Sequence, residues 1–493
     1  MSGLNKSISV ALILMLILSV TGCSATPGSQ SPINSPVKIS YLIQNPIVAN
    51  TTEKTDAPEF YESRISLTGL KDAGIEKGIN DEISALFEEV KGGSLPPYRG
   101  IKRMIPENSE LTGSTVSTNL SYNYNNVASI VVYGYRNYVT PDKTGKVPTV
   151  LEERYQYSQY VGITKSLNYD LNTGKQISLK DVFTDDVDYI EILNDYIGNL
   201  ILRNNVEDEG YYGMAFSGAK LIAPFKGISA DQSFFLVQGG LGLILDENNP
   251  EFDIGFYPAT IIIGFNQLGD SIAITKRFYD EALSPFTSDA PKIKEFIQSY
   301  AGQETVKESS SKIGHIMIYS SYRYPDQIPQ EVKERILALS VIDQDRIAGL
   351  NAAYVAGNDD GSFEQVVWAT KAGPYTSVQR NTNYYANGGW ESATDSICFD
   401  QEGRELALKE LFIAGFDYET SIRKALTDSM TQMSLRESYS VDTLMQTIQF
   451  SIGNSEINIY TDTVKADATS SYPIYAQVTF REFGCENLTL FQE

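Results

Sequence analysis

The residue types that most often carry out catalysis are scarce in this chain. His315 is its single histidine among 493 residues, so a Ser-His-Asp triad, a Cys-His pair and a multi-histidine metal site are each impossible or incomplete. His315 also begins an alternating run, HIMIY, that is typical of a strand. Ser309 and Lys312 match an S-x-x-K spacing, but nothing in their polar, Ser-rich stretch would hold the lysine against the serine. We therefore expect a structural role for His315 and no nucleophilic catalysis.

Carboxylates are the catalytic residue type that the composition supplies in quantity, with 62 Asp and Glu. A pair of them could hydrolyse a glycosidic bond. The candidate clusters are typical of solvated acidic turns, however, and those rich in Asp and Asn lack the oxygen spacing of an EF-hand loop. They are Asp185 with Asp186, residues 207–209 (EDE), residues 246–253 (DENNPEFD) and residues 358–361 (NDDG). We predict no metal and no cofactor, and we keep a carbohydrate-active hydrolase with a carboxylate pair as the alternative function.

Three aromatic residues form the candidate ligand surface. Tyr384, Tyr385 and Trp390 lie on either side of a Gly-Gly pair. Aromatic rings offer a broad apolar face with a polar edge, so these side chains could stack on sugar rings. The alternative is the end of a strand with a half-buried tryptophan.

Two cysteines, Cys398 and Cys485, lie in the last hundred residues. In an oxidising compartment they could form a disulfide, and two buried free thiols are the alternative. Neither belongs to a CxxC pair or has a neighbouring histidine, which argues against a zinc site.

The first 22 residues are predicted to be a signal peptide and not part of the fold. Lys6 precedes an apolar run from Ile8 to Val20, which is too short for a permanent membrane span of about 20 residues. The run ends at Val20-Thr21-Gly22-Cys23, which resembles the lipobox of bacterial lipoproteins. Residues 23–37 are a Ser/Pro/Gly tether. We expect a lipid on Cys23 to hold the chain on the outer face of the cell membrane, with the rest extracytoplasmic.

Composition limits the class of partner. The formal charge of −23 disfavours nucleic acid, because a phosphate backbone needs a basic footprint. It would attract a cationic partner, although solubility alone also explains an acidic surface. The roughly 470 residues that follow the signal peptide exceed what one hydrophobic core usually organises. Two or more domains are expected.

An internal repeat organises the chain. Residues 174–183 (GKQISLKDVF) recur in register as residues 403–412 (GRELALKELF), each followed by an Asp-Tyr pair. Tyr257, Phe265 and Gly269 recur in one register as Tyr472, Phe480 and Gly484, and the apolar spacing of residues 75–86 has a fainter echo at 328–339. Recurrence of three blocks in the same order predicts two diverged copies of one domain.

Within each copy the pattern predicts helices that flank a run of strands. Amphipathic spacing favours helices over residues 73–90 and 188–203, and alternation favours strands over 127–138, 155–170, 233–245 and 259–265. Asn172 to Gly174 is typical of a hairpin turn. The predicted fold is α+β: two repeated domains, each a mostly antiparallel sheet flanked by helices.

The predicted domain boundaries follow from these blocks. The first domain covers residues 38–285 and the second, more diverged, covers residues 312–493. Between them, residues 286–311 are predicted to contain a short amphipathic helix at 290–301 and a polar linker at 303–312.

Several of these blocks resemble a known family, the DUF4163/DUF3298 module of RsiV-like extracytoplasmic domains. Residues 65–72 (ISLTGLKD) with 79–83 (INDEI), residues 168–183 (NYDLNTGKQISLKDVF) and residues 231–236 (DQSFFL) are similar to its hallmark motifs. The second copy matches mainly at 399–418 and near Tyr472, so the chain resembles a diverged tandem pair. Family members commonly carry a histidine before the hairpin, and both copies lack it.

The resemblance implies a fold more than a function, because the module occurs in lysozyme-sensing anti-sigma factors and in some peptidoglycan deacetylases. We expect a surface-anchored lipoprotein that acts as a non-catalytic binding or sensing module. Its expected partner is in the cell envelope: a cationic protein such as lysozyme, or a cell-wall glycan.

Overall fold

The computed structural model describes most of the chain beyond the first 40 residues. The described residues are 41–57, 60–92, 108–141, 158–204, 220–221, 223–245, 249–253, 259–280, 284–298, 304–325, 328–354, 360–435, 439–465 and 470–492. No helix within these ranges is long and apolar enough to cross a membrane.

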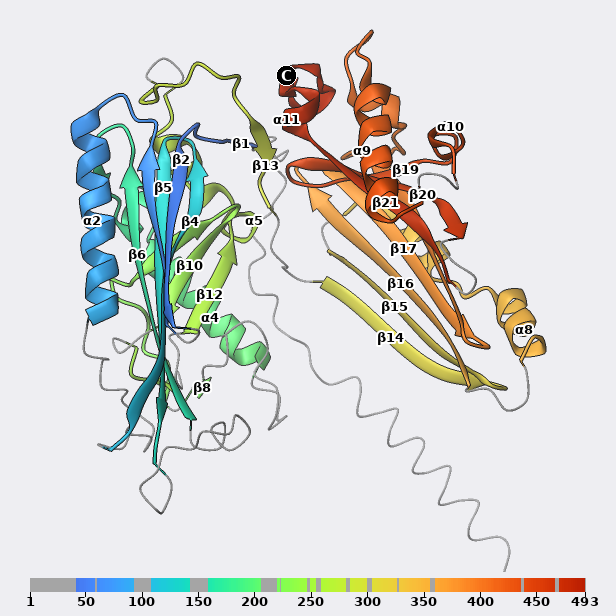
Figure 1. Ribbon diagram of the computed structural model, residues 1–493, viewed down its shortest axis with the longest axis horizontal. Coiled ribbons are helices and arrows are strands. Elements are labelled where there is room, and N and C mark those ends of the chain that lie inside the picture. Colours follow the sequence, from blue (N-terminus) through green and yellow to red (C-terminus); the bar gives the residue numbers. More distant parts are fainter. Residues whose placement is uncertain are drawn as a thin grey trace, which may run out of the picture. The chain divides into compact units, whose positions relative to one another are not determined.

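The first body is built on a six-stranded sheet in the order β2-β3-β4-β5-β6-β7 (Figure 1). All neighbours are antiparallel except β3 and β4, which are parallel. The strands are β2 (Val48–Ala57), β3 (Phe60–Thr68), β4 (Glu110–Tyr124), β5 (Val127–Val139), β6 (Ser158–Asp170) and β7 (Lys175–Gln176).

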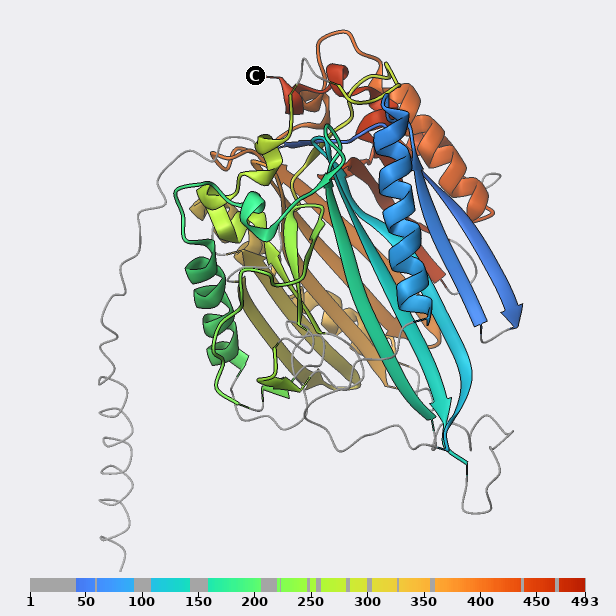
Figure 2. The ribbon, with the colours of Figure 1, turned by 90° about the vertical axis from the view of Figure 1, so that its left-hand side faces the viewer.

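Helix α2 (Ala73–Gly92) lies along one face of this sheet (Figure 2). Its buried residues recur every three or four positions, at Ile79, Ile83, Phe87 and Val90, so one stripe faces the strands. The other face receives a small sheet of order β12-β10-β9 and helix α4 (Tyr189–Asn204). Its strands are β9 (Phe234–Val237), β10 (Gly240–Leu245) and β12 (Ala259–Gly264).

The second body contains an eight-stranded sheet in the order β14-β15-β16-β17-β18-β21-β20-β19. The β15–β16 and β18–β21 pairs are parallel, and the others are antiparallel. The strands are β14 (Glu304–Ile313), β15 (Ile316–Pro325), β16 (Gly361–Ala372), β17 (Tyr375–Ala386), β18 (Gly389–Phe399), β19 (Gln449–Ile452), β20 (Glu456–Lys465) and β21 (Ser470–Thr479). The helices α7 (Gln330–Leu339), α8 (Gln344–Ala352) and α9 (Tyr418–Gln432) pack against it.

The two bodies repeat one order of elements, down to matching hydrogen bonds. In the first, the Ser129 hydroxyl accepts from the Leu236 amide (3.0 Å), and in the second Ser377 accepts from the Ile452 amide (2.9 Å). Ser166 donates to the Phe234 carbonyl (2.5 Å) just as Ser396 donates to the Phe450 carbonyl (2.7 Å). These paired bonds attach β9 to β5 and β6, and β19 to β17 and β18. The α+β prediction of two repeated, mostly antiparallel domains is confirmed.

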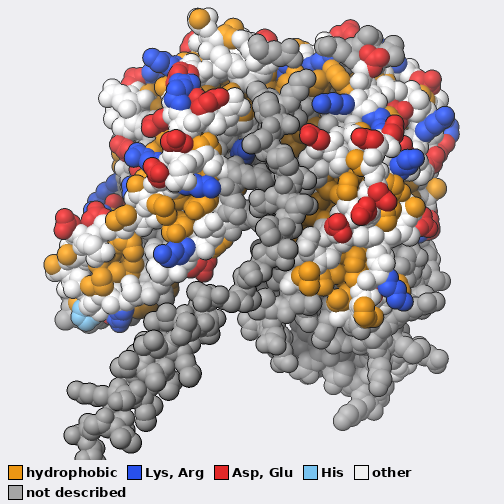
Figure 3. Space-filling model, turned by 180° about the vertical axis from the view of Figure 1, so that it is seen from behind, with side chains coloured by type: hydrophobic (Ala, Val, Ile, Leu, Met, Phe, Trp, Pro, Cys, Tyr) orange, Lys and Arg blue, Asp and Glu red, His pale blue; other side chains and the backbone are white. Residues whose placement is uncertain are grey.

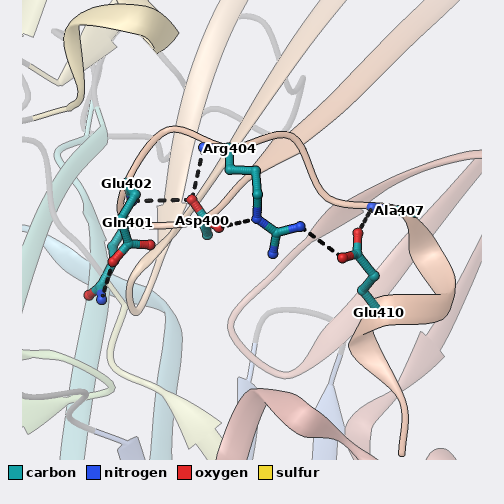
Figure 4. A network of polar contacts seen from close by, with 6 residues as sticks. All are labelled: Asp400, Gln401, Glu402, Arg404, Ala407 and Glu410. Carbon is teal, nitrogen blue, oxygen red and sulfur yellow. Dashed lines mark hydrogen bonds and ion pairs between the residues drawn. The ribbon is translucent and has the colours of Figure 1, made fainter. Parts of the chain in front are cut away.

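The repeated hairpin owes its recurrence to turn geometry. Gly174 and Gly403 both have a positive φ, 71° and 84°, which residues with a Cβ rarely adopt. In the second copy Asp400 accepts from the Glu402 and Arg404 amides, and Arg404 also bonds Glu410 (2.8 Å; Figure 4). Glu410 in turn accepts from the Ala407 amide (2.7 Å), which lowers its pKa, as does the Arg404 guanidinium. The repeated acidic residues are therefore turn and cap residues.

The segment between the bodies differs from its prediction. Residues 290–301 were expected to be helical, but Lys294–Phe296 form a strand, β13, that pairs antiparallel with β1 (Tyr41–Ile43). Phe296 is fully buried in the second core, and its amide donates to the Asn454 carbonyl (2.8 Å). A helix of this length is marginal alone, so the tertiary pairing outweighs its local periodicity.

The predicted polar linker at 303–312 is also wrong, because these residues form most of β14. An edge strand exposed on both faces needs no apolar alternation, and charged residues suit its free edge. The second sheet thus begins at Glu304 and not at residue 312. Similarly, the strand expected over 233–245 is a hairpin, β9 and β10, turned at Gly239 with φ 76°.

Candidate functional site

One face of the second sheet is covered by helices. Val367, Val378 and Phe399 pack against residues of α7, and Phe363 packs with Ile347 of α8. Since strand side chains alternate, the residues between these point to the opposite side, which we call the open face. The cross-strand register groups the following residues there: Val306, Glu308, Ser310, Tyr319, Ser321, Ser362, Glu364, Val366, Gln379, Asn381, Asn383, Tyr385, Trp390 and Ser392.

The open face carries large apolar side chains in contact with solvent. Val306 is 54% exposed, Tyr319 is 47% and Trp390 is 44%. Figure 3 shows hydrophobic side chains on the surface of the second body, among acidic and basic ones. Exposed aromatic groups set among polar ones are a mark of ligand surfaces.

A polar network joins the open face to the strands β19, β20 and β21. The Gln379 amide donates to the Tyr460 hydroxyl (2.6 Å), and Tyr460 lies 3.3 Å from Ser451. Further along, Asn458 accepts from Tyr475 (2.7 Å) and from Gln477 (2.9 Å). Gln379 is buried while Tyr475 is exposed, so the network runs from the sheet to solvent. These side chains hold amide and hydroxyl groups in fixed positions beside the open face.

A cavity of about 450 Å³ lies on β14, β15 and β16. Its lining is Glu308, Ser309, Ser310, Tyr319, Ser320, Ser321, Glu364, Gln365 and Val366, of which six carry side chains on the open face. Glu364 accepts one hydrogen bond, from Asn383 (3.1 Å). Within the described residues, neither Glu308 nor Glu364 has a basic side chain in ion-pair range. The cavity is therefore rich in hydrogen-bond acceptors and carries an aromatic ring.

The structure separates the three predicted aromatic residues. Tyr385 pairs directly opposite Trp390 across β17 and β18, so both are on the open face. Tyr384 points to the other side, where the guanidinium of Arg346 lies 4.4 Å from its ring centroid. Arg346 also contacts the Tyr384 hydroxyl and pairs with Glu391 (3.2 Å). Tyr384 thus anchors α8, and only the other two belong to the candidate surface.

The two cysteines are buried free thiols, which is the second of the two alternatives that the sequence left open. Cys398 contacts Ser377 (3.2 Å) and the Phe450 carbonyl (3.4 Å), and burial raises its thiol pKa to about 12. Cys485 accepts from the Lys294 amide (3.3 Å), on the connecting strand. Each sulfur has its own surroundings in the second core. A deprotonated, reactive thiolate is disfavoured at Cys398.

The remaining candidates are held by structural contacts where they are described. His315 stacks on Tyr354 (centroids 3.9 Å apart) with its Nδ1 3.2 Å from Asp360. Lys312 pairs with Asp360 while Ser309 contacts Ser320, so the S-x-x-K pair does not meet.

The predicted acidic clusters divide in the same way. Asp185 pairs with Arg277 (2.8 Å), and a hydrogen bond from Thr184 lowers the pKa of Asp186. The described residues hold no group of three or more His, Cys, Asp or Glu that could bind a metal ion. Cys23, residues 207–209, and parts of 246–253 and 358–361 lie outside the described residues.

Sequence reasoning missed the acidic and tyrosine residues of the cavity. Glu308 lay in the segment assigned as a linker, and Glu364 is one of many exposed carboxylates. The alternation of Ile316 and Ile318 after Gly314 was the available signal, since it predicts a hairpin that makes residues 304–313 a strand.

No protein-family model matches the chain, and no curated protein matches it. Similar solved structures include a member of the DUF3298 family from Bacteroides fragilis, at 16% identity, covering 49% of this chain and 99% of that chain, with a TM-score of 0.28. A DUF3298 family protein from Pseudomonas aeruginosa is similar at 13% identity, covering 48% of this chain and 96% of that chain, with a TM-score of 0.27.

Proposed function

We propose that the protein is a non-catalytic binding module of the cell envelope and that the open face of its second body holds the partner. The observation that carries the proposal is the open face itself. It combines Tyr319 and Trp390, both exposed, with a lined cavity and a fixed amide and hydroxyl network. Surfaces of this composition give shape, stacking and directional hydrogen bonds without a reactive group.

The location is proposed from the sequence. The apolar run of residues 8–20 and the Val20-Thr21-Gly22-Cys23 quartet support a lipid on Cys23, and the Ser/Pro/Gly composition of residues 24–36 supports a tether. A lipid anchor with a tether would keep a binding face outside the membrane, within reach of envelope polymers and proteins.

The family placement is also a proposal. The hallmark-like segments at 65–83, 168–183 and 231–236 support a DUF4163/DUF3298-like first domain. The matching serine contacts of the two bodies support a tandem arrangement in which the second domain is a diverged copy.

Retention of an envelope component by the immobilised full chain tests the function. We expect wild-type protein in detergent to retain a glycan fraction or a basic protein from envelope extract, and Trp390→Ala to reduce retention by about threefold to tenfold. Tyr133→Ala is the matched control, because Tyr133 is an exposed aromatic on the first sheet. Equal retention by all three proteins would contradict the proposal.

The hydrolase remains the competing function, because Glu308 and Glu364 line one cavity. Turnover of a peptidoglycan or oligosaccharide panel that is lost in Glu308→Gln or Glu364→Gln would establish it.

A further inference from the structure

We propose that the cavity on β14, β15 and β16 takes a glycan whose sugars carry free primary amines. The inference rests on the proposed binding function and names the ligand of the same face. The occupant is a polysaccharide segment with protonated amino groups, lying across the strands.

The hydrogen-bonding capacity of the cavity selects a ligand rich in donors. Two carboxylates, Glu308 and Glu364, accept only, and Ser310 and Ser321 can accept as well as donate. Sugar hydroxyls and ammonium groups are donors. An ammonium near two carboxylates also gains charge-assisted hydrogen bonds.

Charge complementarity points to the amine. Neither carboxylate has a basic partner within the described part of the chain. The exposed Arg323 lies two residues along β15 from Ser321. Glu308, Glu364 and Arg323 therefore carry a combined formal charge of −1, and the formal net charge of the whole chain is −23. A polyanionic glycan would meet repulsion in this place, and a protonated amine would not.

The aromatic residues point to a sugar chain and not only to an amine. Tyr319 lines the cavity on β15, and Trp390 lies three strands away on β18 on the same face, with Tyr385 opposite it on β17. Three strand spacings are about 14 Å, which is longer than a single sugar. The amides of Asn381 and Asn383 lie on β17 between these rings, where they can bond hydroxyls along the chain. A segment of several sugars can therefore stack at both ends and bond in the middle.

The test uses the full chain in detergent and two oligosaccharides that differ only in their amino groups. One is a hexamer of β-1,4-linked glucosamine, and the other is the hexamer of N-acetylglucosamine. We expect calorimetry at low salt to show about tenfold tighter binding of the free amine form, with the preference lost at 1 M salt, where the screening length is about 3 Å.

The variants separate the amine from the stacking. Glu308→Gln and Glu364→Gln should each weaken binding of the glucosamine hexamer by about threefold to tenfold and leave the acetylated hexamer unaffected. Tyr319→Ala should weaken both. Glu53→Gln is the matched control, because Glu53 pairs with Ser63 in the first sheet as Glu308 pairs with Ser321, and it should change nothing.

A lysine hexapeptide decides between a glycan and a basic protein. If the peptide binds as tightly as the glucosamine hexamer and depends equally on Tyr319, the glycan inference is overturned in favour of a cationic polypeptide. If neither hexamer binds while the envelope component is still retained through Trp390, the inference fails and the proposed function stands. If nothing is retained in either experiment, the proposed function itself fails.

Discussion

The two bodies share a strand arrangement but differ in the side chains at one junction. In the first body this junction lies where β9, β10 and β12 meet the six-stranded sheet, and in the second it lies where β19, β20 and β21 meet β17 and β18. The correspondence follows from the paired serine contacts and the strand register. In the first body these positions form an apolar cluster, and in the second they form a polar network. The equivalent pairs are Val131 and Gln379, Phe235 and Ser451, Gly242 and Asn458, Ile244 and Tyr460, and Ile262 and Gln477.

The difference shows that one strand topology can carry either an apolar or a polar junction. In the first body Val131 and Ile244 are fully buried, so this junction is part of the core. In the second, the same backbone carries amides and hydroxyls that bond each other and reach solvent at Tyr475. Side-chain chemistry, and not strand order, separates a structural junction from a candidate ligand surface.

Exchanging the equivalent side chains Val131 and Gln379 should change stability, and the larger loss is expected in the first body. Val131→Gln puts an amide into the apolar cluster of Phe235 and Ile244 and should lower the free energy of unfolding by about 2–4 kcal/mol. The reverse change, Gln379→Val, gives up one hydrogen bond to Tyr460 and gains apolar burial, so it should cost about 1 kcal/mol or less. Urea unfolding of both variants measures the asymmetry. Equal costs would mean that the two junctions are energetically alike.

The close packing of the first junction can be tested by adding a methyl group at Gly242. A Cβ on Gly242 would lie 2.4 Å from the Phe235 ring, whereas the equivalent Asn458 has room for its side chain. Gly242→Ala should therefore destabilise the protein by about 1–3 kcal/mol through overpacking. Gly198→Ala, in helix α4 with nothing within 4 Å of its Cβ, is the control and should be neutral or stabilising. Thermal unfolding of the two variants decides, and similar shifts in Tm would disprove the close packing.

Glu295, on the connecting strand β13, lies between the two bodies in sequence and tests them together. Its carboxyl contacts the first body, whereas its neighbour Phe296 belongs to the second core. Glu295 accepts from Tyr124 (2.7 Å) and from Gln238 (2.8 Å), and burial raises its pKa. The folded state thus holds the proton more tightly than the unfolded chain. The stability from this group is complete below the ordinary glutamate pKa, about 4.3, and is lost as pH rises through the raised value.

We therefore expect wild-type protein to lose stability relative to Glu295→Gln as pH rises from about 4 to 7. Denaturant unfolding at several pH values measures the difference, with the exposed Glu110→Gln as the control. A wild-type minus variant difference that is constant with pH would contradict the raised pKa.

The smallest expected effect concerns Cys398, which stands where the first body has Asn168. Both side chains donate to a phenylalanine carbonyl, of Phe450 and of Phe234. Since the Cys398 thiol pKa is about 12, thiol reagents at pH 8 should modify it only after unfolding, with no change in stability beforehand. Mass spectrometry after timed alkylation reports this, and Cys398→Ser identifies the labelled site. Rapid labelling of native protein would place the sulfur nearer the surface.

Sequence alone predicts the elements whose pattern is local. The apolar spacing of residues 73–90 and 188–203 predicts α2 and α4 to within a few residues, and the repeat predicts the shared hairpin. The strand at 294–296 could not be predicted, because its partner Tyr41–Ile43 is about 250 residues away and its local spacing is helical. Of the candidate surface, Tyr385 and Trp390 were predictable from their types. Glu308 and Tyr319 join them only through strand register, which no single segment contains.

The edge strand β14 has a consequence for association between molecules. It pairs with β15 along one side, and among the described strands none pairs with its other side. A row of backbone donors and acceptors there could template a strand from a second molecule. Lys307, Glu308 and Lys312 stand on that strand, and stripping water from such groups would oppose the addition. The strand's polar composition therefore acts as a barrier to uncontrolled sheet extension at high protein concentration.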